Sequence, residues 1–237
     1  MSRNSSIAKL LRIVGIVLMG ITAAFTLMGG AGTTCVALAA EKFGEKMAPI
    51  APYKWLYILF VLVTVAIGVM GVRSVVLLIK GRANAYRYTL IALVLGILVG
   101  VIHMAVSRSL RGSSMPVDGV VYITVLTLLV FLLFRIPFIW QGVNYEKPSS
   151  DPDLPRNAAA IVLLLSSALT LTVQYWAGPT HMFDGVNYAD AWHTQLTLLG
   201  WAFCLLGVGL LAASPLKRLL RGTSASPHKT DTKLVSS

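Results

Sequence analysis

Six long stretches that are nearly free of charged residues dominate this chain of 237 residues. Each is about twenty residues long, enough for a helix to cross the roughly 30 Å hydrocarbon core of a bilayer. A segment in hydrocarbon must satisfy its own backbone hydrogen bonds, and none of the stretches alternates as the strands of a membrane barrel do. The sequence therefore predicts an all-α polytopic membrane protein, a bundle of six transmembrane helices. The predicted spans are 13–34, 55–79, 88–107, 119–140, 158–177 and 194–214.

The composition supports this prediction and delimits the rest of the chain. Only 12% of the residues are charged and the mean hydropathy is +0.76, whereas soluble domains carry about 25% charged residues. Residues 1–12 form a basic segment ahead of the transmembrane domain 13–214. The polar segment 215–237 has no apolar face, and we expect it to be a disordered basic tail.

The formal net charge of +11 is distributed unevenly between the two sides of the predicted bundle. If the N-terminus is cytoplasmic, the inner segments hold fifteen of the 20 basic residues, as the positive-inside rule requires. The outer segments hold the other five: Lys42, Lys46, Lys54, Arg108 and Arg111. The sequence thus predicts cytoplasmic N- and C-termini in a multi-pass protein of the cytoplasmic membrane, the inner membrane of the cell. No recognition motif accompanies the charge, so we expect no nucleic-acid partner.

Glycines and a short charged segment follow one another at the end of the first span. We expect Gly29, Gly30 and Gly32 to bend or end the first helix. The following segment "VALAAEKFGEKM", residues 36–47, then predicts a short amphipathic helix along the outer interface.

Histidine and aspartate gather on the predicted outer side. The stretch "HMFDGVNYADAWH", residues 181–193, contains two histidines and two aspartates. At 100° per residue, His103 shares a face of its helix with small residues, and His193 does the same on the last helix. Because a polar side chain facing lipid is costly, we expect both histidines to point into the bundle.

This cluster has several interpretations, all of which the sequence leaves open. Imidazole and carboxylate ligands suit one transition-metal ion, for which the candidates are His103, His181, Asp184, Asp190 and His193. Alternatively, His103 and His193 bind one haem b as axial ligands from facing helices, or accept a proton from a quinol. The competing interpretation is structural: Asp184 before Gly185 forms a turn, and Asp190 is the N-cap of the sixth helix.

The fifth span is the most polar and suggests a pore. Ser166, Thr170 and Gln174 recur at intervals of four and share one helix face. Hydroxyl groups at such positions can also bond to carbonyls of their own helix. No charged residue lies in the middle of the membrane, which disfavours proton-driven transport.

The function classes follow from these features. The sequence has no G-x-S-x-G, P-loop or H-E-x-x-H motif, which favours a protein without enzymatic activity. The first hypothesis is a membrane anchor or scaffold subunit that contacts the lipid bilayer and other membrane subunits. The alternative is a redox or metal-binding membrane protein with an extracytoplasmic His/Asp site, and the third hypothesis is a small-solute channel.

Overall fold

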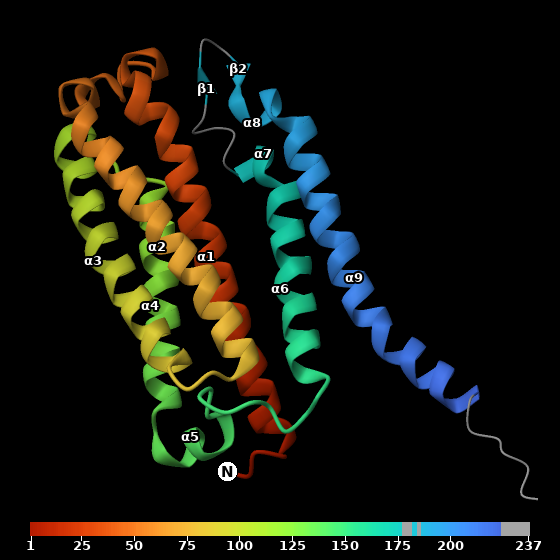
Figure 1. Ribbon diagram of the computed structural model, residues 1–237. Helices are drawn as coiled ribbons and strands as arrows, with labels where there is room; N and C mark the ends of the chain where they lie inside the picture. Colours follow the sequence, from red (N-terminus) through yellow and green to blue (C-terminus); the bar gives the residue numbers. More distant parts are fainter. Residues whose placement is uncertain (177–181, 184–185, 224–237) are drawn as a thin grey trace, which may run out of the picture.

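The computed structural model describes residues 1–176, 182–183 and 186–223, and its long helices run side by side (Figure 1). In these residues, six helices are long and apolar enough to cross a membrane. They are α1 (Ser6–Ala39), α2 (Lys54–Lys80), α3 (Ala85–Arg111), α4 (Val117–Phe134), α6 (Leu154–Leu171) and α9 (His193–Thr223). The predicted all-α, six-helix fold is confirmed, and the chain is a helical, multi-pass membrane protein.

Short elements connect these helices. They are the 3-10 helices η1 (Ala40–Phe43) and η2 (Ala48–Tyr53), the helices α5 (Pro137–Val143), α7 (Val173–Trp176) and α8 (Tyr188–Ala191), and the strands β1 (Met182–Phe183) and β2 (Val186–Asn187). The two strands pair antiparallel, with Met182 opposite Asn187.

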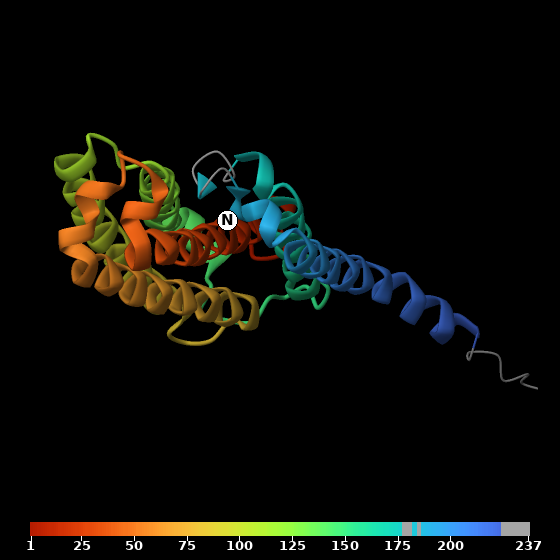
Figure 2. The ribbon, with the colours of Figure 1, turned by 90° about the horizontal axis from the view of Figure 1, so that it is seen from above.

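The helices form two groups around α1. In the first group, α1 packs along α2, α3 packs between α2 and α4, and α4 returns to α1. In the second, α9 packs on α6, which joins the first group mainly through α1. Seen from above, the α6–α9 pair lies to one side of the other four helices (Figure 2). Glycines permit the close approaches, since Gly71 of α2 lies against Ala23 and Gly20 of α1 against Val162.

The end of α1 differs from the prediction. The helix continues through its glycines to Ala39, so the expected end of the helix at these glycines was wrong. Gly30 instead lets α1 approach Val65 of α2, so its lack of a side chain serves packing. The expected amphipathic helix over 36–47 is also absent, because this part of the described chain completes α1 and then forms only the 3-10 turn η1.

The later helix boundaries differ as well. The span predicted over 119–140 is two helices, because α4 ends at Phe134 and Pro137 starts α5. Ile136 has an extended ψ of 126°, as expected for a residue that precedes proline. The fifth span ends at Leu171 and is followed by α7. Helix α9 continues to Thr223, and residues 224–237 of the predicted tail lie outside the described residues.

One end of the bundle, which we name the closed end, carries the N-terminus, α5 and the loop 144–153. Arg12 of α1, only 4% exposed, donates to the carbonyls of Val143, Asn144 and Lys147 at 3.2, 3.0 and 2.8 Å. The buried Tyr145 hydroxyl donates to the Arg12 carbonyl at 3.1 Å. Burial raises the pKa of the Tyr145 phenol, so this group stays a neutral donor. These bonds fasten the loop to α1.

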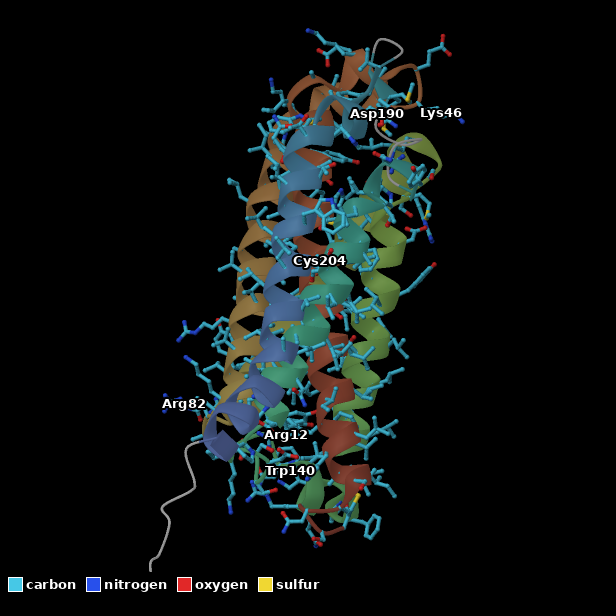
Figure 3. The ribbon with its side chains drawn as sticks, turned by 90° about the vertical axis from the view of Figure 1, so that its right-hand side faces the viewer. Arg12, Lys46, Arg82, Trp140, Asp190 and Cys204 are labelled. Carbon is cyan, nitrogen blue, oxygen red and sulfur yellow. The ribbon has the colours of Figure 1, made fainter. Side chains whose placement is uncertain are left out.

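The opposite end, which we name the open end, carries η1, η2 and the α3–α4 turn. Figure 3 shows Arg12 and Trp140 near the closed end and Lys46 near the open end. The described end of α9 points toward the same end of the bundle as the N-terminus (Figure 1). An even number of spans requires this arrangement.

Candidate functional site

A cavity of about 360 Å³ lies at the open end, among α1, η1, η2, α2, α3 and the start of α4. Its walls are partly apolar, with Val36, Phe43, Met47 and Ile50 among the lining residues. Its polar lining comes mainly from Lys46, Tyr57, His103, Ser107 and Arg111. The cavity is therefore amphipathic, and its volume falls in the range of about 300–1,000 Å³ that is typical of small-molecule sites.

Helix α3 supplies three of the polar residues from a single face. His103, Ser107 and Arg111 are spaced by four, so they lie one above another along the helix. Ser107 is held in place by Tyr57 of α2, whose hydroxyl lies 2.8 Å from the Ser107 hydroxyl. This polar row runs from the interior of the bundle to its open end.

His103 is buried without a hydrogen-bond partner. Its side chain is 5% exposed, and its ring stacks on Phe60 with the centroids 4.4 Å apart. Tyr57 meets the same ring edge-on at 5.3 Å. In the part of the chain that the structure describes, neither ring nitrogen forms a hydrogen bond. No described residue therefore satisfies the imidazole, which lines the cavity and can bond to a group inside it.

Arg111 retains unused hydrogen-bonding capacity. Its Nη2 donates to the Met115 carbonyl at 2.7 Å, whereas its buried Nε has no acceptor among the described residues. Lys46 brings a second positive charge to the cavity. The nearby Asp118 is already bound by Arg108, at 3.1 Å, and by the Ser114 hydroxyl.

Among the described lining residues, the charge of this cavity is therefore unbalanced. Of the described residues that line it, two carry a positive charge and none carries a carboxylate. Fixed positive charges inside a cavity with apolar walls attract an anion more strongly than they would in open water. The arrangement can bind and orient a negatively charged group.

The two histidines predicted as a pair lie apart. His193 is exposed at the start of α9, and its Nδ1 lies 2.9 Å from Oε1 of Gln174. Its helix packs on α6, whereas the helix of His103 packs between α2 and α4, on the other side of the bundle (Figure 1). The structure therefore does not bring together the facing helices that we expected to share a haem.

The remaining cluster residues are only partly described. Asp190 is exposed within α8 and is not the N-cap of α9, because that helix begins at His193. His181 and Asp184 lie outside the described residues. Among the residues that are described, no three His, Cys, Asp or Glu side chains form a metal-ligand group. Metal, haem b or quinol binding by this cluster stays a prediction, for which metal analysis and the absorbance spectrum of the purified protein are the tests.

The polar residues of the predicted pore have other contacts. The Thr170 hydroxyl donates to the Ser166 carbonyl of its own helix at 2.8 Å. Gln174 lies in α7, beyond the end of α6, and contacts His193 at the start of α9. Pore lining by Ser166, Thr170 and Gln174 stays a prediction.

Most of the cavity could not be predicted from the sequence. The spacing of His103, Ser107 and Arg111 is visible in the sequence and predicts a polar helix face. Lys46 and Tyr57 precede His103 by 57 and 46 residues and join this face only through tertiary packing. No local pattern in the sequence indicates that contribution.

Comparison with known proteins gives no relative from which a ligand could be inferred. No protein-family model, no curated protein and no solved structure matches this chain.

Proposed function

We propose that this protein is a non-enzymatic, multi-pass protein of the cytoplasmic membrane that binds a small anionic molecule in the open-end cavity. The observation that carries the proposal is that Arg111, whose Nε has no described acceptor, Lys46 and the buried His103 line one cavity of about 360 Å³. A guanidinium group binds carboxylate and phosphate oxygens through charge-assisted hydrogen bonds.

The proposal includes an orientation in the membrane. The distribution of basic residues supports a cytoplasmic closed end and an extracytoplasmic open end. The cavity then receives its ligand from outside the cell membrane or from the outer leaflet. A membrane-impermeant maleimide should label Lys46→Cys in intact cells and should label Arg82→Cys, in the turn between α2 and α3, only after the membrane is opened. The reverse pattern would invert the assignment.

Ligand-induced stabilisation tests the binding itself. In a neutral detergent, butyl phosphate should raise the thermal midpoint of the purified protein in a saturable manner. A ligand at a hundred times its Kd adds about 2.7 kcal/mol to the free energy of unfolding. Arg111→Gln should abolish the shift because it removes the guanidinium group, one of the two cations that line the cavity. The matched control is Arg108→Gln on the same helix, since Arg108 is half-exposed and paired with Asp118 outside the cavity. Equal shifts in both variants would refute the proposal.

A second candidate function is that of an anchor or scaffold subunit, which the exposure of α9 favours. Leu198, Trp201, Leu205 and Leu206 are each more than half exposed, and the described part of α9 packs mainly on α6. A stoichiometric membrane partner that co-purifies with the wild-type protein, but not with a Leu205→Arg variant, would support this candidate. Unchanged recovery of the partner would remove α9 as the contact.

A further inference from the structure

A narrow crevice continues the cavity toward the middle of the bundle. Its volume is about 30 Å³, and it shares Thr33, His103 and Val117 with the cavity above. A still smaller void of about 10 Å³ follows and shares Thr26, Ile67, Gly96 and Thr124 with the crevice. The three spaces therefore follow one another along the seam between α1, α2, α3 and α4.

Glycines create the crevice. Gly29 and Gly30 of α1, together with Gly96 and Gly100 of α3, are among its lining residues. An added Cβ at Gly96 would lie 3.4 Å from Cγ2 of Thr124, which is ordinary contact, whereas one at Gly100 would lie 2.7 Å from Cγ2 of Val121. The absence of side chains at these positions keeps the space open.

Three of the four threonines that line the crevice use their hydroxyls within their own helices. The hydroxyls of Thr26, Thr33 and Thr124 donate to carbonyls of their own helices, at 2.7, 2.7 and 2.6 Å. Hydroxyls that are satisfied in this way offer little to a polar ligand, and their methyl groups complete an apolar wall. The crevice therefore suits hydrocarbon better than an ion.

His103 stands where the two environments meet. It lines both the cavity and the crevice, and it has no hydrogen-bond partner among the described residues. This buried imidazole, which the described residues leave without a hydrogen bond, is a second observation, independent of the glycines, that points to a ligand at this junction.

We infer that the ligand is a single-chain amphiphile whose carboxylate or phosphate head lies at Arg111 and Lys46 and whose hydrocarbon chain passes His103 into the glycine-lined crevice. This inference rests on the proposed function and adds the class of ligand. A void of about 30 Å³ holds about two water-sized groups, so it receives only the end of one chain, while the rest of the chain lies in the larger cavity. The His103 ring then contacts the atoms that join head and chain.

Photo-crosslinking tests the position of the chain. The probe is octyl phosphate with a diazirine at the end of its chain, added to the full-length protein in neutral detergent. Labelled peptides should include crevice residues such as Thr64, Ile67 and Thr124. Gly96→Leu fills the crevice and should reduce this labelling at least tenfold, while stabilisation by butyl phosphate persists. The matched control is Gly119→Leu, because an added Cβ there meets nothing within 4 Å.

The outcomes separate this inference from the proposed function. Labels confined to lipid-facing residues, with butyl phosphate binding intact, would overturn the inference alone. Inorganic phosphate that binds as tightly as octyl phosphate would also overturn it, since the ligand would then be a free anion. Failure of both alkyl phosphates to bind would remove the proposed function as well. If an alkyl quinone binds and its binding does not depend on Arg111, the inference of an anionic head is overturned in favour of a quinone ligand. If Gly96→Leu does not fold, Gly96→Ala gives the same comparison with a smaller reduction.

Discussion

The closed and open ends of the bundle each contain an arginine withdrawn from solvent, but the two arginines differ in their hydrogen bonds and in the space beside them. Arg12 donates to three backbone carbonyls, and the void beside it measures about 10 Å³. Arg111 donates to one carbonyl and faces a cavity of about 360 Å³. Each leaves its Nε without a described acceptor, so a single unpartnered atom does not distinguish them. The number of carbonyl acceptors and the volume of the adjoining space distinguish the two arginines.

The connecting loops explain the difference. The loop 144–153 is long enough to fold back over α1 and to present its carbonyls to Arg12. The α3–α4 turn spans only residues 112–116 and supplies one carbonyl, from Met115. The same guanidinium group therefore stabilises the fold at one end and stays available to a ligand at the other.

The largest expected effect compares one glycine from each end. Gly81 and Gly112 both have left-handed backbone angles, with φ of +61° and +69°. An alanine pays about 1–2 kcal/mol for this conformation. At Gly81 the new Cβ also collides with the backbone of Lys147 and Pro148, whereas at Gly112 it meets nothing within 4 Å. Unfolding in mixed micelles should show a loss above about 3 kcal/mol for Gly81→Ala and about 1 kcal/mol for Gly112→Ala. Equal losses would mean that the closed-end loop does not pack on the α2–α3 turn.

The second effect compares the arginines directly. Arg12→Gln should lower the free energy of unfolding by about 3 kcal/mol, because it leaves buried carbonyls without donors. Arg111→Gln should cost about 1 kcal/mol or less in the absence of ligand, because it removes one hydrogen bond. The same unfolding assay measures both variants. A larger loss for Arg111→Gln would assign that residue a structural role and weaken the contrast between the two ends.

The smallest expected effect concerns the ion pair between Lys9 and Asp151 at the closed end. Lys9 donates to Asp151 at 2.9 Å, and this hydrogen bond lowers the pKa of the Asp151 carboxyl below its ordinary value of 3.8. The carboxylate therefore stabilises the fold above the unfolded pKa and loses this effect as the pH falls through the lowered folded pKa. Asp151→Asn should cost less than about 1 kcal/mol near neutral pH, and the difference from wild type should vanish in strong acid. A Lys9→Gln, Asp151→Asn double variant should lose no more than either single variant, and additive losses would show that the two residues act independently.

The fold was predictable because a membrane helix can be recognised from its own stretch of sequence. A long apolar stretch such as that of α3 needs no information from the rest of the chain to be recognised. The arrangement of the helices was not predictable in the same way, since residues that face lipid and residues that face another helix are equally apolar. The central place of α1 therefore became visible only in three dimensions.

The candidate site was likewise predictable only where the sequence information is local. His103 was predicted to lie toward the open end and to point inward, and it lies buried in the cavity. Its predicted partner His193 lies on a helix that packs elsewhere, because similar depth in a membrane says nothing about position around the bundle. Tyr57 and Phe60, which surround the His103 ring, come from a different span and carry no polar pattern that links them to it.

The fastening of Arg12 also has a consequence for biosynthesis. Its acceptor in Lys147 follows it by 135 residues, which a ribosome adds in roughly 7–27 s at about 5–20 residues per second. During this interval the first helix is already in the membrane, while a guanidinium group destined for the interior still lacks its carbonyls. The nascent chain must therefore keep that group at the lipid headgroups until 147 of the 237 residues have been made. A polypeptide truncated before Val143 would lack all three carbonyls that accept hydrogen bonds from Arg12.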